Sequence, residues 1–202
     1  MLIWFFILAG AAFWWFKKVD QHQRIALLGA ALARFDIEKL MESLTDGYLR
    51  ALGEEGAERQ AQVWSYLAVQ EQTLSEQFSA FSAEFAAQSA EQTRVSTLPI
   101  ALPFAARWWP RGTFDAREAF ALHARGIAGV IENRAGLDPK AKAFTLSAEL
   151  FLMQHSCHWF CRSRAVASAR LMARHKTSYA QVLKSVSGQT REAYVRLVGR
   201  KA

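Results

Sequence analysis

The chain has 202 residues, a formal net charge of +7 and a hydrophobic content of 51%. This length allows one or two domains, and the hydrophobic fraction is ample for a buried core. Few Gly and Pro residues, with abundant Ala, Gln, Glu and Arg, predict an all-α fold and exclude low-complexity classes. The two cysteines fit a reducing compartment better than a disulfide-stapled secreted domain.

The first sixteen residues, MLIWFFILAGAAFWWF, carry no charged side chain, and Lys17 and Lys18 close the run. A helix of this length measures ~24 Å against a ~30 Å hydrocarbon core, and snorkelling lysines with interfacial tryptophans make up the difference. Residues 1–18 are therefore expected to form a single transmembrane anchor in contact with membrane lipids. Two alternatives stay open, which are a signal peptide cleaved near Ala9-Gly10-Ala11 and a fully buried soluble helix.

Basic residues follow the apolar run and predict its orientation. Lys17, Lys18, Arg24 and Arg34 come after it, with Asp20 the only acid among them. Because positive charge stays on the cytoplasmic side of a span, we expect a single-pass protein of the inner (cytoplasmic) membrane whose C-terminal domain lies in the cytoplasm.

The rest of the chain divides by composition. The anchor (1–18) is followed by juxtamembrane helices and a long heptad-like acidic helix (19–94), a Pro/Trp-rich crossover (95–113) and a basic helical domain (114–202). Helices are expected over 20–35, from an Asp36 cap, over 57–94, from Asp115 to about Arg134, from Asp138-Pro139 to about His175, from Thr177 or Ser178 to near Gly188, and from Thr190 onward. No strand of any length is expected.

The long acidic helix carries a seam at steps of three and four residues. Its members are Trp64, Leu67, Glu71, Leu74, Phe78, Phe81, Phe85 and Gln88. Two packings fit the seam, an antiparallel hairpin within the monomer, which we favour, and a coiled-coil dimer. Glu71 interrupts the seam with a charge, and we interpret it as a pairing or register residue rather than a catalytic acid.

Pro99, Pro103 and Pro110 prevent the crossover from forming one regular helix. The segment is too apolar for a free linker, so two interpretations remain. It either packs on the helical core as an ordered connection, or it presents an interfacial patch to the bilayer or to a partner. The residues of that patch would be Arg107, Trp108, Trp109 and Arg111.

Both cysteines and two histidines lie within seven residues, His155 to Cys161, of one predicted helix. That helix is apolar on two sides, which predicts a central, buried position. At ~100° per residue His155 points away from the cysteines, whereas Cys157, His158 and Cys161 can supply part of a zinc or haem ligand set. Core packing and a redox or acylated thiol are the alternatives, and core packing, with no cofactor, is the favoured one.

Charge is split along the chain. Residues 36–92, the acidic half, hold eleven acids against three bases, whereas residues 139–202, the basic half, hold twelve bases against two acids. The halves can neutralise each other, within one molecule or across a homo-oligomer, or the basic half can bind an anionic partner. Arg162, Arg170 and Arg174 share one third of a helix circumference and would carry the charged contacts. Anionic lipid fits better than nucleic acid.

No nucleophile elbow and no phosphate-binding glycine loop is present, so an enzyme is not expected. The sequence predicts a membrane-anchored cytoplasmic scaffold or interaction protein, an accessory component of a membrane-associated complex. Its partner would be another protein or a second copy. The alternatives are a metal- or thiol-dependent helper that uses the Cys157/His158/Cys161 cluster and a nucleic-acid-binding module in the basic half.

Overall fold

A computed structural model describes residues 2–199, and helix accounts for 79% of them, which confirms the all-α class. The helices are α1 (Leu2–Leu32), α2 (Ile37–Gly53), α3 (Ala57–Phe85), α4 (Ala90–Thr93), α5 (Ala105–Trp108), α6 (Ala116–Ile131), α7 (Pro139–Cys161), α8 (Arg164–His175), α9 (Tyr179–Ser185) and α10 (Gly188–Val198). A 3-10 turn, η1 (Pro110–Gly112), and two short strands, β1 (Arg94–Ser96) and β2 (Thr113–Asp115), complete the chain.

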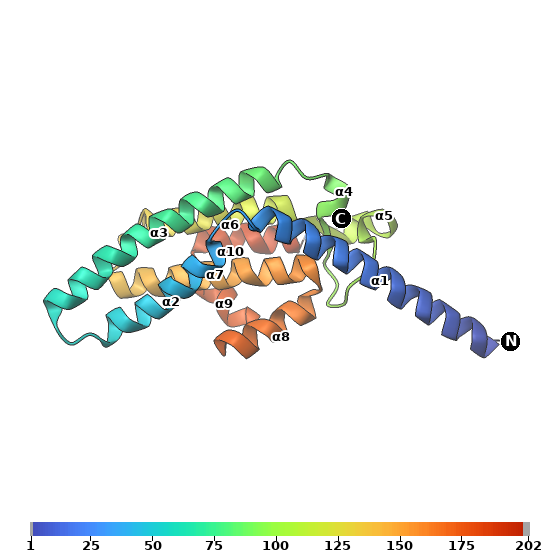
Figure 1. Ribbon diagram of the computed structural model, residues 1–202, viewed down its shortest axis with the longest axis horizontal. Helices are drawn as coiled ribbons and strands as arrows, with labels where there is room; N and C mark the ends of the chain where they lie inside the picture. Colours follow the sequence, from blue (N-terminus) through green and yellow to red (C-terminus); the bar gives the residue numbers. More distant parts are fainter. Residues whose placement is uncertain (1, 200–202) are drawn as a thin grey trace.

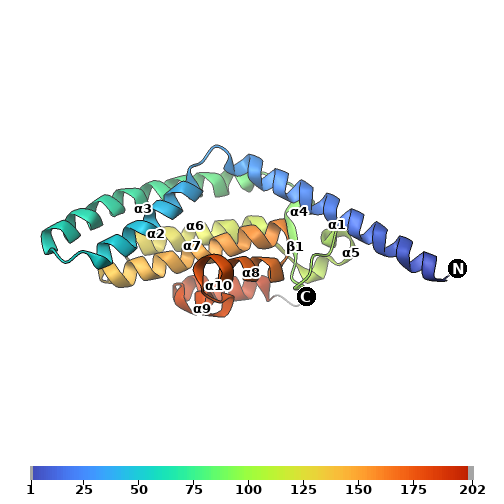
Figure 2. The ribbon, with the colours of Figure 1, turned by 60° about the horizontal axis from the view of Figure 1, so that its bottom comes forward.

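The helices form layers, seen edge-on in Figure 2. The α2–α3 hairpin, with the inner part of α1, makes the top layer, while α6 and α7 make the middle layer. The small helices α8, α9 and α10 cover the underside of the middle layer. The chain therefore places its acidic half above the middle layer, and most of its basic half within and below it.

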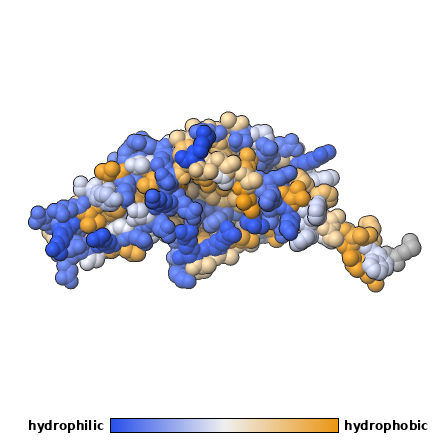
Figure 3. Space-filling model, viewed as in Figure 1, coloured by the Kyte–Doolittle hydropathy of each residue, from blue (hydrophilic) through white to orange (hydrophobic). Residues whose placement is uncertain are grey.

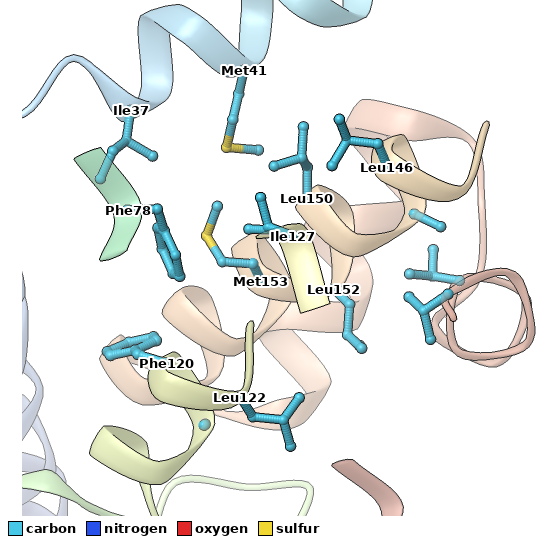
Figure 4. Close-up of a cluster of buried hydrophobic side chains, with 14 of the residues drawn as sticks. Ile37, Met41, Phe78, Phe120, Leu122, Ile127, Leu146, Leu150, Leu152 and Met153 are labelled. Carbon is cyan, nitrogen blue, oxygen red and sulfur yellow. The ribbon is translucent and has the colours of Figure 1, made fainter. Parts of the chain in front are cut away.

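Buried apolar side chains from all three layers join one core. Phe78 of α3, Phe120 and Ile127 of α6, and Leu146 and Leu152 of α7 are each fully buried (Figure 4). Burial of each such side chain is worth ~1.5–3 kcal/mol, so the middle layer is held from both sides. The predicted central position of the α7 helix is confirmed.

The amino-terminal helix α1 is 31 residues long and leaves the body as an isolated rod (Figure 1). The predicted continuation of the anchor helix into residues 20–35 is confirmed as far as Leu32. Within residues 2–199, no helix combines the length and the apolarity that a membrane crossing requires. The expected transmembrane helix is therefore not confirmed.

The heptad-like seam faces the interior, and α3 packs antiparallel to α2 as an intramolecular hairpin (Figure 1). Six seam residues are buried, namely Leu67, Glu71, Leu74, Phe78, Phe81 and Phe85. The predicted extension of this helix to residue 94 is wrong. The helix ends at Phe85, the last aromatic of the seam, and Ser89 caps the separate short helix α4 by accepting a bond from the Gln92 amide.

The prediction that no strand forms is also wrong. Strands β1 and β2 pair antiparallel, with Val95 opposite Phe114. Each strand has only three residues, so neither shows an alternation that a sequence pattern can detect. The pairing is specified instead by tertiary contacts, because the Trp159 indole donates to the Ser96 carbonyl and its ring packs edge-on to Phe114.

Helix boundaries follow the caps. The predicted N-caps Asp115 and Asp138 are confirmed, and of Thr177 and Ser178 it is Ser178 that caps α9, since each of these three side chains accepts a bond from an amide of its own first turn. Asp36 precedes α2 as predicted, but its side chain makes no capping bond. The single helix expected from residue 138 to residue 175 is wrong. It breaks after Cys161, where Ser163 accepts a bond from the Val166 amide and caps α8 as a new helix.

Helices α6 and α10 differ slightly from the expected limits. Helix α6 ends at Ile131 rather than near Arg134, and Gly136 adopts a left-handed conformation in the connection that follows. The final helix starts at Gly188 rather than Thr190, because the Ser187 side chain accepts a bond from the Thr190 amide.

Candidate membrane-binding site

The outer part of α1 is an exposed apolar rod. Residues 3–16 are all exposed, and the ten large apolar side chains among them expose 46% to 74% of their surface. Figure 3 shows the rod projecting from an otherwise largely polar surface. Because its apolar side chains surround the whole helix, the rod has no polar face directed at water.

The rod joins the body at a sharp polar boundary. Lys18 follows the apolar run, and its Nζ lies 4.9 Å from the centre of the Trp14 ring. One turn further on, α1 becomes part of the body, where Arg24 donates to Asp20 at 2.9 Å with both side chains buried. The Arg162 guanidinium also donates to the Gln21 side chain at 2.9 Å. The bond between Arg162 and Gln21 ties this part of α1 to the end of α7.

The crossover forms a closed loop beside this boundary. At its base β1 pairs with β2, and the Thr97 amide donates to the Gly112 carbonyl at 2.9 Å. The Ala165 amide donates to the Pro99 carbonyl at 3.0 Å, which ties the loop to the start of α8. The interpretation of this segment as an ordered, packed connection is therefore confirmed for its base.

The tip of the same loop is exposed. Trp108 in α5 exposes 75% of its surface and Trp109 exposes 44%. Arg107 and Arg111, on either side, are exposed as well. Two tryptophans and two arginines thus face solvent at the end of the body that carries the rod (Figures 1 and 2). We call these four residues the loop-tip patch.

A ring contact links the rod to the loop-tip patch. Phe104 caps α5, and its ring packs edge-on to the Phe16 ring with the centroids 6.2 Å apart. Trp108 lies four residues beyond Phe104, which is ~6 Å along a helix. Within the loop, the Trp109 ring lies against Gly112, where an added Cβ would come within 2.4 Å of the ring. The contact between Phe16 and Phe104 therefore ties the rod to the loop that carries the patch.

No protein-family model, no curated protein and no solved structure matches this chain. The function therefore has to follow from the geometry of the chain itself.

The Cys157/His158/Cys161 cluster lies at the carboxyl-terminal end of α7. The Cys157 thiol contacts the Met153 sulfur at 3.9 Å. Burial raises the pKa of the Cys157 thiol, and burial raises the pKa of Cys161 to about 11. Both thiols are therefore protonated near neutral pH, whereas metal ligation and nucleophilic attack require the thiolate.

Burial, followed by the charges of Arg170 and Arg174, lowers the pKa of His158. Among the residues that the structure describes, no group of three or more His, Cys, Asp and Glu side chains is placed to hold a metal ion. The ligand set proposed from Cys157, His158 and Cys161 stays a prediction.

The three arginines expected to carry charged contacts are exposed, and two of them contact α1 or α2. Arg162 donates to Gln21, and Arg174 lies 3.7 Å from a Glu38 carboxylate oxygen and 3.9 Å from one of Glu42. Arg170 is exposed on α8. The acidic and basic halves therefore pair within one molecule at this surface.

A buried polar network between α6, α7 and α10 was missed by the sequence reasoning. His123 Nε2 lies 2.8 Å from Ser156 Oγ, which lies 2.9 Å from the Tyr194 hydroxyl. Nearby, the His155 ring stacks on Tyr179 with the centroids 4.5 Å apart. His123, His155, Ser156 and Tyr194 are all at most 2% exposed, so this network binds the layers together rather than meeting a substrate.

Proposed function

We propose that this protein is a membrane-attached helical interaction protein whose amino-terminal rod inserts into a lipid bilayer. The observation that carries the proposal is the exposure of residues 3–16, which are apolar on all sides and contact no other element along most of their length. An apolar surface of this kind on a soluble protein marks an interaction site.

The energetics favour lipid as the environment of the rod. Moving one large apolar side chain out of water is worth ~1.5–3 kcal/mol, and ten such side chains are exposed here. A single myristoyl chain, by comparison, gives only marginal membrane binding. The rod therefore suffices as a stable anchor without a second lipid signal.

Depth and orientation follow from length and charge. Residues 3–16 span ~21 Å as a helix, which is less than the ~30 Å hydrocarbon core. A complete single span would need the bilayer to thin locally and Lys17 and Lys18 to snorkel toward the headgroups. Because these lysines lie on the body side of the rod, we place the body on the cytoplasmic side of the inner membrane.

The loop-tip patch would form the second membrane contact. Tryptophan favours the headgroup level, and arginine pairs with lipid phosphates. Trp108, Trp109, Arg107 and Arg111 project beside the point where the rod leaves the body. With the rod inserted, they would rest on the membrane surface and hold the body upright, so that its layered sides remain free for protein partners.

Flotation with lipid vesicles tests the insertion. We expect the full-length wild-type chain, purified in detergent and reconstituted, to float with the vesicles and to resist carbonate extraction. The double variant Ile7→Asp/Phe13→Asp places charges in the exposed rod and is expected to stay largely in the bottom fraction. The matched control Tyr66→Asp/Val69→Asp alters two side chains on α3 that are similarly exposed, and it should float like the wild type.

Orientation is tested in cells with tags at each end. A carboxyl-terminal tag should be reached only after the cytoplasmic side is opened. An amino-terminal tag that is reached from outside supports a complete span, whereas an amino-terminal tag protected on both sides supports insertion into one leaflet. A wild-type chain that does not float contradicts the whole proposal.

A further inference from the structure

A groove runs between α2 and α7, which lie side by side (Figure 2). Its larger part is a hollow of about 650 Å³, and a smaller hollow of about 190 Å³ adjoins it. Both hollows have Thr45, Phe151 and His175 in their walls, so they form one continuous groove. Helix α9 provides a third wall for the larger hollow through Val182 and Ser185.

The groove has the length of a short helix. On α2 it extends from Glu38 to Leu52, and on α7 it extends from Lys140 to Gln154. Each stretch measures ~21 Å at ~1.5 Å per residue, which is the length of about four helical turns. A groove between helices that has this length fits an amphipathic helix laid along it.

The larger hollow is lined mostly by apolar side chains, and several of them are in contact with water. Leu49 exposes 68% of its surface and Phe144 exposes 65%. Phe144, Ala148 and Phe151 are spaced three or four residues apart, so they form one stripe along α7. Large apolar side chains that gather on one exposed surface mark an interaction site.

The smaller hollow forms an acidic end of the groove. Its walls carry Glu38, Glu42 and Asp46, which are exposed and lie four residues apart on one face of α2, against the single guanidinium of Arg174. Arg174 lies 3.7 Å from Glu38 and 3.9 Å from Glu42, yet these two glutamate side chains remain 83% and 67% exposed. Burial, followed by the charge of Arg174, lowers the pKa of His175, so this ring adds no positive charge near neutral pH.

The opposite end of the groove is electrically balanced. Asp138 and Lys140 both line the larger hollow, so their charges offset each other. The Asp138 carboxylate also accepts a bond from the Ala141 amide and so caps its own helix. An occupant of the groove therefore meets an apolar surface that is neutral at one end and acidic at the other.

We infer that the groove binds an amphipathic helix of another protein, one that carries lysine or arginine residues beside its apolar face. The inference rests on the proposed interaction function and names the chemistry of the partner. Contact with the stripe of Phe144, Ala148 and Phe151 would supply apolar burial, and the acidic end would select the charge of the partner. A neutral or acidic helix would leave the carboxylates of that end without a counter-charge.

Binding of a labelled model helix tests the inference. The probe is an amidated peptide of two LKKLLKL repeats, which carries leucines on one face and lysines on the other. A peptide of two LEELLEL repeats is the charge control. Fluorescence anisotropy is measured with the full-length chain in an uncharged detergent, and the signal from detergent alone is subtracted. We expect saturable binding of the lysine peptide and at least about tenfold weaker binding of the glutamate peptide.

A pair of variants tests the apolar part of the groove. Phe144→Ser removes an exposed ring from the stripe and should weaken binding of the lysine peptide about fivefold or more. Val69→Ser is the matched control, because Val69 exposes 66% of its surface on α3 outside the groove, and it should leave binding unchanged. Equal binding to the two variants overturns the inference.

A second pair of variants tests the acidic end. Glu38→Gln/Glu42→Gln/Asp46→Asn should weaken binding of the lysine peptide about tenfold or more, because it removes the counter-charges of the lysines. The control removes the same charge from three exposed positions outside the groove and should change binding little, namely Glu55→Gln/Glu58→Gln/Glu76→Gln. Equal losses in the two triple variants would assign the binding to net charge alone and overturn the inference.

Three further outcomes also contradict it. These are no binding of the lysine peptide, equal binding of both peptides, and a wild-type dimer in sedimentation equilibrium that Phe144→Ser dissociates, since the last would assign the groove to a second copy of the chain. All of these measurements are made without a bilayer. Failed docking of the helix and failed membrane attachment therefore give separate readings.

Discussion

Lys142 Nζ lies 2.5 Å from Glu71 Oε2, and this ion pair joins the basic half of the chain to the acidic half inside the protein. The other carboxylate oxygen of Glu71 accepts a bond from the Tyr48 hydroxyl at 2.7 Å. The Glu71 side chain is only 5% exposed, and that of Lys142 is 19% exposed. The charge that interrupts the α3 seam is therefore a pairing residue, as its position in the sequence predicts.

Replacing Lys142 with alanine should destabilise the fold by about 3–5 kcal/mol, because a buried carboxylate loses its charged partner. Thermal unfolding in detergent, followed by circular dichroism, measures this change. The double variant Glu71→Leu/Lys142→Met removes both charges and should recover most of the loss. Glu132→Gln, which breaks the exposed pair with Arg134, should change stability by less than about 1 kcal/mol. If Lys142→Ala lowers the stability of the fold by no more than Glu132→Gln does, the Glu71–Lys142 pair does not stabilise the fold.

Two glycines of α6 should respond to alanine with opposite signs. A Cβ at Gly126 would lie 2.4 Å from Thr190 Oγ1 and 2.8 Å from Glu149 Oε2, whereas a Cβ at Gly129 meets nothing within 4 Å. Gly126→Ala should destabilise by about 1–3 kcal/mol through overpacking. Gly129→Ala should stabilise by about 0.5–1 kcal/mol, because alanine favours the helix.

Each kcal/mol corresponds to about 2–4 °C in Tm for a chain of this size. Equal shifts of Tm in the two glycine variants would show that α6 and α10 do not approach as closely as the structure has them.

The buried histidines make the protein sensitive to acid. Burial, with smaller effects from His158 and Arg164, lowers the pKa of His155 from 6.5 to about 4. Between these pH values His155 is therefore neutral in the folded state and protonated in the unfolded chain. The stability that the neutral His155 contributes is therefore fully present above about pH 6.5 and is lost as the pH falls toward 4.

His155→Phe keeps a ring against Tyr179 and removes the titration, so its Tm should fall less between pH 6.5 and pH 4 than that of the wild type. The difference contributed by one such histidine is up to about 3 kcal/mol. Burial also raises the pKa of Glu149, so this residue changes stability with pH in the direction opposite to His155. Because Glu149 is present in both the wild type and the variant, its effect cancels when the two Tm profiles are compared. Parallel Tm profiles would contradict the assignment of the effect to His155.

The loop-tip patch should strengthen membrane binding without being its main anchor. Trp108→Ala/Trp109→Ala should weaken the partition of the full-length chain into anionic vesicles by about tenfold or more, since interfacial tryptophans contribute apolar area at the headgroup level. Vesicle co-sedimentation across a lipid titration measures it. Arg107→Gln/Arg111→Gln should weaken binding to anionic vesicles and leave binding to neutral vesicles unchanged. Loss on both vesicle types would contradict a role for these arginines in headgroup recognition.

Local signals predicted much of the fold. Asp115 and Asp138 were identified as caps, and Ser178 as one of two candidates with Thr177, because a short polar side chain before an apolar helical pattern commonly caps a helix. The break at Ser163 was missed, since the apolar helical pattern continues through it, although Ser163 supplies a local cap for α8 by accepting a bond from the Val166 amide. The β1–β2 pairing was missed for a related reason, because Val95 and Phe114 meet through packing under Trp159 rather than through a local pattern.

The candidate membrane site could be predicted only in part. A helix that is apolar on all sides has the same sequence pattern whether it is buried in protein or in lipid. The structure distinguishes these cases in part, because residues 3–16 are exposed on the protein. The exposure of Phe144 on α7 (65%) was not foreseen, because Phe144 lies on an apolar side of a helix that the sequence predicts to be buried. Its exposure depends on how far α2 and α9 extend along α7, and no local pattern of residues encodes that relation.

A fluorescent reporter on the rod tests the central claim most directly. In a Cys157→Ala/Cys161→Ala background, an environment-sensitive dye is attached to Ile7→Cys or, as the control, to Tyr66→Cys. On reconstitution into vesicles, we predict a strong blue shift of emission from position 7 and no shift from position 66. An unchanged emission from position 7 would show that the rod stays out of lipid and would contradict the account.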